Sequence, residues 1–101
     1  MFTVTAQFNV IPGKEAEAEA AMKAVAEQVE ANEPGALTYL WHRNTKDPAQ
    51  ILVFEVYRDQ EAVDQHRASP YLAEFQKYFG PVFDPASVKI VRYERFAGVN
   101  R

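Results

Sequence analysis

The chain has 101 residues, a formal net charge of -3 and no cysteine. Because domains commonly contain about 100–150 residues, this length predicts a single domain. Hydrophobic residues make up 48% and charged residues 25% of the chain, a balance typical of a globular protein and unlike that of a disordered one.

The composition also excludes several kinds of site and partner. Without cysteine, the chain has no disulfide, thiolate metal site or cysteine nucleophile. With 14 acidic and 11 scattered basic residues it presents no broad positive field, so we expect no nucleic-acid partner. No apolar run approaches the ~20 residues of a membrane span, and the N-terminus lacks signal-peptide features. A soluble, cytoplasmic protein with no membrane partner is expected.

The first third of the chain predicts a strand followed by a helix. Residues 2–11 (FTVTAQFNVI) alternate apolar and polar side chains, which is the period of a strand with one apolar face. After Pro12-Gly13, residues 14–32 are strong helix formers with glutamates near the start. The apolar stripe of this helix consists of Ala18, Ala21, Met22, Val25 and Val29. Because the stripe is rich in alanine, we expect the helix to lie close on one face of a sheet.

The middle of the chain predicts a β-hairpin. Glu33-Pro34-Gly35 marks a stop after the helix. Two β-rich runs follow at residues 36–44 (ALTYLWHRN) and 50–58 (QILVFEVYR), and the turn-forming segment TKDPA separates them.

The last part of the chain predicts a broken helical region and a final strand. Residues 59–68 place Ala62, Val63 and His66 on one helical face. Ser69-Pro70 supplies an N-cap followed by proline, and the helical period continues through Leu72, Phe75 and Phe79. Gly80-Pro81 ends this region, and residues 87–96 (SVKIVRYERF) predict the last strand.

The predicted order is βαββαβ, which indicates an α+β, ferredoxin-like sandwich whose antiparallel sheet carries its helices on one face. In the strand at 50–58, Ile51 and Val53 lie on one side, whereas Leu52, Phe54 and Val56 lie on the other. One apolar side therefore lacks a cover within the chain. Exposing apolar surface costs about 25 cal/mol per Å², so we expect a second copy to cover it in a homodimer.

Four segments follow one another along the chain: PGK at 12–14, EPGALTY at 33–39, FEVYRDQEAVDQH at 54–66 and SPYLAEF at 69–75. Together they resemble the antibiotic biosynthesis monooxygenase (ABM) domain family of the dimeric α+β barrel superfamily, over roughly residues 2–96. The resemblance implies a dimeric α+β barrel with a pocket between sheet and helices. In the founding members it implies oxygenation of quinol or anthrone-like polyphenols by molecular oxygen without metal or flavin, so no cofactor is expected.

The resemblance leaves other activities open. Some relatives degrade haem with an asparagine, a tryptophan and a histidine, but the matching positions here hold Ala6, His66 and Gln76, so this activity does not carry over. Other relatives resemble the segment EVYRDQEAVDQHRASP and isomerise a small phosphorylated, sugar-derived signal. A non-catalytic dimer that binds small hydrophobic compounds is a third alternative. The expected ligand is thus a small aromatic or polar metabolite.

His66 and Glu55 are the candidate catalytic residues. A histidine can take a proton from a phenolic hydroxyl near neutral pH and leave an electron-rich anion that reacts with oxygen. A carboxylate among apolar strand residues must be paired or have a raised pKa, and either state suits acid-base work. Alternatively, His66 fills the gap between helix and sheet, and Glu55 forms a structural pair with His66 or Arg58. The resemblance favours a Glu55–His66 pair.

Aromatic side chains form the candidate substrate-binding set. Tyr39 and Trp41 share the parity of Leu37, so they project to one sheet face and can stack on a flat ring. Plain core packing is the alternative for each member of the set, which comprises Tyr39, Trp41, Tyr57, Tyr71, Phe75 and Tyr78. His42 has the opposite parity and is expected at the surface. With only two histidines, not spaced i, i+4, no metal site is expected.

Overall fold

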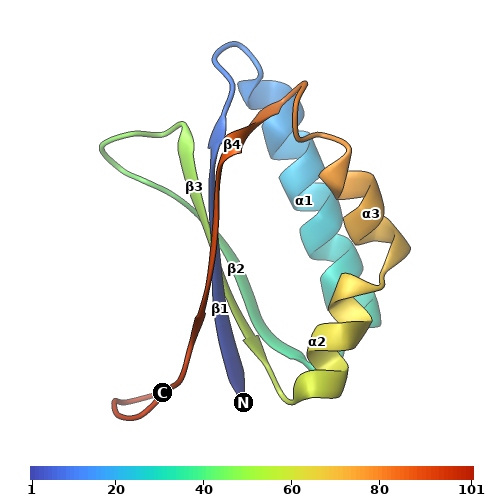
Figure 1. The fold of residues 1–101 in the computed structure, drawn as a ribbon, viewed down its shortest axis with the longest axis vertical. Coiled ribbons are helices and arrows are strands. Elements are labelled where there is room, and N and C mark those ends of the chain that lie inside the picture. The colour runs from blue at the N-terminus through green and yellow to red at the C-terminus, as the bar shows by residue number, and fades with distance from the viewer.

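The computed structural model describes residues 1–101, which form one four-stranded sheet and three helices. The elements are β1 (Phe2–Val10), α1 (Glu15–Asn32), β2 (Ala36–Arg43), β3 (Gln50–Tyr57), α2 (Gln60–Arg67), α3 (Pro70–Gln76) and β4 (Phe83–Tyr93). All neighbouring strands are antiparallel in the order β2-β3-β1-β4. The three helices lie on one face of this sheet and leave the other face bare (Figure 1). The predicted ferredoxin-like α+β fold is confirmed.

Helix α1 packs on the sheet through the predicted alanine-rich stripe. The buried residues of α1 are the five that the sequence pattern indicated. Four of them, all except Val29, join Phe8, Ile51 and Val53 of the sheet in the main hydrophobic core. α1 lies over β2 and beside α3, whereas Ile90 of the edge strand β4 is 65% exposed on the same side of the sheet. None of the helices combines the length and apolar character that a membrane-crossing helix needs.

The break between α2 and α3 is built from local caps. Asp59 caps α2 by accepting a hydrogen bond from the backbone N–H of Ala62 at 2.9 Å. Ser69 caps α3 as predicted, accepting from the Leu72 N–H at 3.3 Å, and its hydroxyl also donates to the His66 carbonyl at 2.8 Å. Because α2 ends at Arg67, His66 lies in its last turn. His66 is buried there, with only 7% of its surface exposed.

Gly35 allows β2 to begin close against α2. A Cβ atom at this position would lie 2.6 Å from the Cβ of Ala62, closer than carbon atoms can approach. The Gly35 carbonyl also accepts a hydrogen bond from the Arg58 N–H at 2.9 Å. This contact brings the segment between α1 and β2 beside the helix that carries His66.

Three predicted boundaries were wrong. α3 ends at Gln76, and Phe79 pairs with Phe83 in an isolated bridge. β4 begins at Phe83, not at 87, because it is an edge strand, where Pro85 removes no ladder hydrogen bond that the sheet needs. It ends at Tyr93, not at 96, because Tyr93 pairs with Thr3 at the start of β1 and no partner strand extends further.

The bare face of the sheet is apolar near its centre, as the two-sided pattern of β3 predicted. Directly opposed residues form a row across the four strands, from Leu40 through Phe54 and Thr5 to Val91. Leu40 is 54% exposed and the neighbouring Leu52 is 38% exposed. Neighbouring exposed leucines on a sheet face are typical of a contact surface.

Candidate active site

A cavity of about 660 Å³ lies between the sheet and the α2–α3 region. Of the 17 residues that line it, 13 are hydrophobic, and the lining comes from all four strands and from α2 and α3. Val88 and Ile90 of β4 line the cavity and are 40% and 65% exposed, so the cavity opens beside this edge strand. The volume lies within the range of about 300–1,000 Å³ that is usual for small-molecule sites.

His66 lines this cavity and is held from one side. Its Nδ1 atom lies 3.1 Å from both carboxylate oxygens of Glu33. Its Nε2 atom lies 3.9 Å from Oε1 of Glu55, which is too long for a hydrogen bond. The rings of Tyr39 and Tyr57 flank the imidazole, with centroid separations of 5.3 and 5.4 Å. The predicted Glu55 contact is therefore the looser one, and Glu33 is the hydrogen-bond partner.

Glu33 is the member of the cluster that sequence reasoning missed. The residue is the C-cap of α1 and only 3% exposed, and its carboxylate accepts hydrogen bonds from the Tyr71 hydroxyl and from His66. In the sequence, Glu33 stands in the helix stop Glu33-Pro34-Gly35 and in the segment EPGALTY, and neither pattern pointed to a contact with His66. A glutamate at a helix C-terminus is unfavourable, because it faces the negative end of the helix dipole. This unfavourable position was the sequence signal that Glu33 has a role other than ending the helix.

Glu55 is 7% exposed and accepts a hydrogen bond from the Tyr57 hydroxyl at 2.5 Å. Burial raises the pKa of Glu55 above its ordinary value, although the Tyr57 hydrogen bond and the nearby His66 oppose the shift. The alternative partner, Arg58, forms its ion pair with Asp59 at 3.2 Å instead. Glu55 thus holds its proton to a higher pH than an exposed glutamate does.

Two tyrosines of the cluster donate hydrogen bonds to its carboxylates, Tyr57 to Glu55 and Tyr71 to Glu33. Burial, reinforced by Glu55, raises the pKa of both Tyr39 and Tyr57. Burial and the hydrogen bond to Glu33 raise the pKa of Tyr71 to about 12. All three hydroxyls therefore stay protonated at neutral pH.

Replacing Glu55 by glutamine should change how stability depends on pH. A carboxyl whose pKa is raised in the folded state contributes stability below its ordinary pKa of 4.5, and this contribution is lost as the pH rises through the folded value. Glutamine stays neutral and still accepts the Tyr57 hydrogen bond. We expect Glu55→Gln to unfold at a higher temperature than the wild type at neutral pH, with the difference vanishing below pH 4.5. Thermal unfolding across this range measures it.

Glu27→Gln, on the exposed face of α1, is the matched control and should leave the profile parallel to that of the wild type. A parallel profile for Glu55→Gln as well would show that the burial of Glu55 does not perturb its ionisation.

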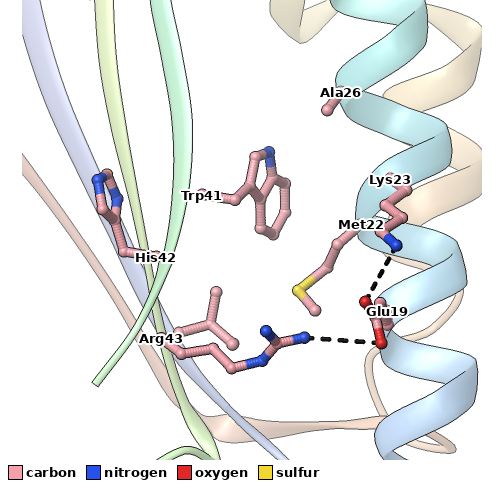
Figure 2. A pocket seen from close by; sticks show the side chains of 8 residues that line it. Glu19, Met22, Lys23, Ala26, Trp41, His42 and Arg43 are labelled. Atoms are coloured by element: carbon pink, nitrogen blue, oxygen red, sulfur yellow. Dashed lines mark ion pairs between the residues drawn. The ribbon is translucent and has the colours of Figure 1, made fainter. Parts of the chain in front are cut away.

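Tyr39 and Trp41 project from β2 to the helix side, as their parity predicted. Their rings lie 5.9 Å apart, and Trp41 also contacts Phe75 at 5.4 Å. His42 lies on the opposite side of the strand and is exposed (Figure 2). Leu37, in contrast, is 51% exposed, because the register shifts between Ala36 and Thr38.

Four of the six predicted substrate-binding residues line the cavity, namely Tyr39, Trp41, Tyr57 and Phe75. Tyr71 lies outside the lining and donates its hydroxyl to Glu33. Tyr78 also lies outside, with 39% of its surface exposed, because α3 ends before it and the helical period does not continue. Two further polar residues line the cavity: Arg67, to which no sequence pattern pointed, and Gln76, which the resemblance matched to a residue of the haem-degrading relatives.

A second, smaller hollow of about 200 Å³ lies between α1 and β2 (Figure 2). Its charged groups are already paired, since Glu19 lies 3.0 Å from Lys23 and 3.7 Å from Arg43. These pairs are exposed and contribute little energy. Trp41 lines both spaces. Only the larger cavity contains buried titratable side chains, so it is the candidate site.

Proteins of similar structure or sequence are known from several organisms. A protein from Caulobacter crescentus CB15 is 28% identical, with a TM-score of 0.86 over 95% of this chain and 90% of that one. PA3566 from Pseudomonas aeruginosa has a TM-score of 0.84 at 24% identity, over 95% of this chain and 94% of that one, which shows a shared fold. Protein sll1783 from Synechocystis sp. is 34% identical over 62 residues, covering 60% of this chain. The matched segment spans only 42% of sll1783.

The family assignment rests on a broader match. Residues 1–78 match the model of the family described as antibiotic biosynthesis monooxygenase. The matched range includes β1, the β2–β3 hairpin and all three helices. Glu33, Glu55 and His66 all lie within it. The chain belongs to the antibiotic biosynthesis monooxygenase family.

Proposed function

We propose that the protein is a cofactor-independent monooxygenase that oxidises quinol or anthrone-like aromatic small molecules with molecular oxygen. The observation that carries this proposal is His66, whose Nε2 side has no hydrogen-bond partner and which lines a mainly apolar cavity of about 660 Å³. A base at the wall of an apolar cavity suits a substrate that is flat, apolar and weakly acidic. Membership of the family supports oxidation as the general reaction.

In the proposed reaction, the aromatic substrate packs against Trp41 and Phe75, and Nε2 of His66 accepts a proton from an acidic C–H or phenolic O–H. The resulting carbanion or phenolate passes electrons to oxygen, a C–O bond forms, and the peroxide anion takes the proton back from His66 to become a hydroperoxide. His66 then takes the remaining proton from that carbon, the O–O bond breaks, and the departing oxygen takes up a proton and leaves as water. The carbon becomes the carbonyl of a quinone, and the proton on His66 replaces the one given to the water. One oxygen atom ends in the new carbonyl group and the other in water, and the substrate supplies all the electrons.

Glu55 is the proposed proton donor in the second half of the reaction. Its raised pKa lets it hold a proton, and its Oε1 lies 3.9 Å from the base. Protonation of the departing oxygen turns hydroxide into water, a better leaving group. Tyr39 and Tyr57 stay protonated and orient the substrate oxygens, while the apolar lining limits water around the reacting anion.

The proposed active form is a homodimer, in which a second copy covers the bare sheet face to complete a dimeric α+β barrel. Leu40 and Leu52, which are exposed on this face, support this arrangement. Light scattering at micromolar concentration should give about twice the chain mass of 11.5 kDa. A stable monomer at that concentration would contradict the proposal.

Oxygen uptake by metal-free protein with a panel of quinols and anthrones tests the proposed reaction. We expect uptake above the autoxidation blank and formation of the matching quinone. The same mixtures are run anaerobically, because an isomerase would form product without oxygen. Product in the anaerobic arm, or ligand binding without turnover in either arm, would overturn the monooxygenase proposal.

A further inference from the structure

The contact between Glu33 and His66 determines which nitrogen of the imidazole carries the proton. The Glu33 and His66 side chains are 1% and 9% exposed, so water does not compete strongly for this contact. A carboxylate only accepts hydrogen bonds, and a neutral imidazole carries a single N–H. With both Glu33 oxygens 3.1 Å from Nδ1, the N–H of neutral His66 must be on Nδ1 and the lone pair on Nε2.

The opposite side of the ring leaves Nε2 free. Oε1 of Glu55 is 3.9 Å away and already receives the Tyr57 hydroxyl. His66 and Glu55 line the cavity, whereas Glu33 does not. Nε2 is therefore the only nitrogen of His66 that a bound molecule can reach as a proton acceptor.

Glu33 is anchored by contacts with several elements. The backbone N–H of Glu33 donates to the Val29 carbonyl at the end of α1, and the backbone carbonyl of Glu33 accepts from the Ala36 N–H at the start of β2. The Tyr71 hydroxyl, from α3, donates to the carboxylate itself. The contact of Gly35 with Ala62 keeps this segment against α2. Three elements thus hold the carboxylate in place behind the imidazole.

We propose that Glu33 is the positioning residue of the site, holding His66 in the Nδ1–H tautomer so that Nε2 receives the substrate proton. The catalytic part of this inference rests on the proposed function. In Glu33→Gln, the amide oxygen can keep the Tyr71 hydrogen bond while the amide N–H₂ faces Nδ1. Nδ1 then becomes the acceptor, and the proton moves to Nε2, which blocks the reacting atom.

The tautomer is measurable without any substrate. The chain has only two histidines, so ¹⁵N-histidine labelling gives two ring patterns in a long-range ¹H–¹⁵N correlation spectrum, and His42→Gln assigns them. Above neutral pH, we expect His66 of the wild type to show a protonated Nδ1 and an unprotonated Nε2. In Glu33→Gln, we expect the reverse pattern, with Nε2 protonated and Nδ1 unprotonated. Tyr71→Phe keeps the carboxylate and should keep the wild-type pattern.

A protonated Nε2 in the wild type, an unchanged pattern in Glu33→Gln, or an exchanged pattern in Tyr71→Phe would each overturn the proposal. If Glu33→Gln does not fold, the wild-type and Tyr71→Phe spectra still decide it. Kinetics then test the catalytic consequence: Glu33→Gln should lower kcat on the order of 10²-fold or more with KM little changed, since Glu33 does not line the cavity. If the oxidation assay shows no activity, the kinetic test cannot be made, but the spectroscopic test of the tautomer still decides the proposal.

Discussion

His66→Gln should lower oxygen-dependent turnover by about 10²–10⁴-fold, the usual contribution of a positioned general base. Glutamine cannot take a proton at the position of Nε2. Its amide N–H can still donate to the buried Glu33 carboxylate, so the substitution removes the base without leaving this carboxylate unpaired. The measurement is the initial rate of oxygen consumption with the best quinol or anthrone from the panel.

Glu27→Gln is the control, because Glu27 is exposed on α1 and lines neither the cavity nor the bare face of the sheet. It should leave the rate within about twofold of the wild type, a difference too small to represent lost base catalysis. Circular dichroism and thermal unfolding verify that both variants fold. If His66→Gln were as active as Glu27→Gln, His66 would not be the base, and its role would be to fill the space between α2 and the sheet.

Phe83→Ala should lower the free energy of unfolding by about 3–5 kcal/mol, the usual effect of truncating a fully buried phenylalanine. Phe83 is 0% exposed, and its ring lies 5.0 Å from that of Phe8, 5.3 Å from that of Phe75 and 5.1 Å from that of Phe79. It does not line the cavity. The loss is a large part of the stability of a small domain, which is typically about 5–15 kcal/mol.

Urea unfolding at one fixed protein concentration measures this loss, since association would make stability depend on concentration. The control is Phe96→Ala, because Phe96 is 94% exposed. It should change stability by no more than about 0.5 kcal/mol. A loss below about 1 kcal/mol for Phe83→Ala would show that the aromatic cluster around Phe83 is not a packed core.

The buried polar cluster has an energetic cost that packing alone does not explain. Glu33, Glu55 and His66 are each at most 7% exposed, and two carboxyls share one imidazole. Removing such groups from water is unfavourable unless they are paired, and Glu55 meets this cost in part through its raised pKa. An apolar side chain at position 55 would fill the same space without this cost. The proposed proton transfer at the cavity wall would give this cost a function.

The sequence by itself determined most of the fold and part of the site. Alternation defined β1, the stripe of α1 identified its five buried residues, and the Ser69 cap located the start of α3. Parity placed Tyr39 and Trp41 on the helix side of the sheet and His42 on the other. These features depend on neighbours within one or two turns or along one strand, so local periodicity and capping chemistry suffice to predict them.

Only the tertiary structure decided which groups meet at the site. Glu33 and His66 are 33 positions apart, and their contact depends on how the end of α1 lies against α2. The start of β4 before Pro85 depends on this strand lying at the sheet edge, and the exclusion of Tyr78 from the cavity depends on where α3 ends. Periodicity specifies which face of an element is apolar, but not the distance or rotation between elements. Those are set by packing, and they decide which carboxylate holds the histidine.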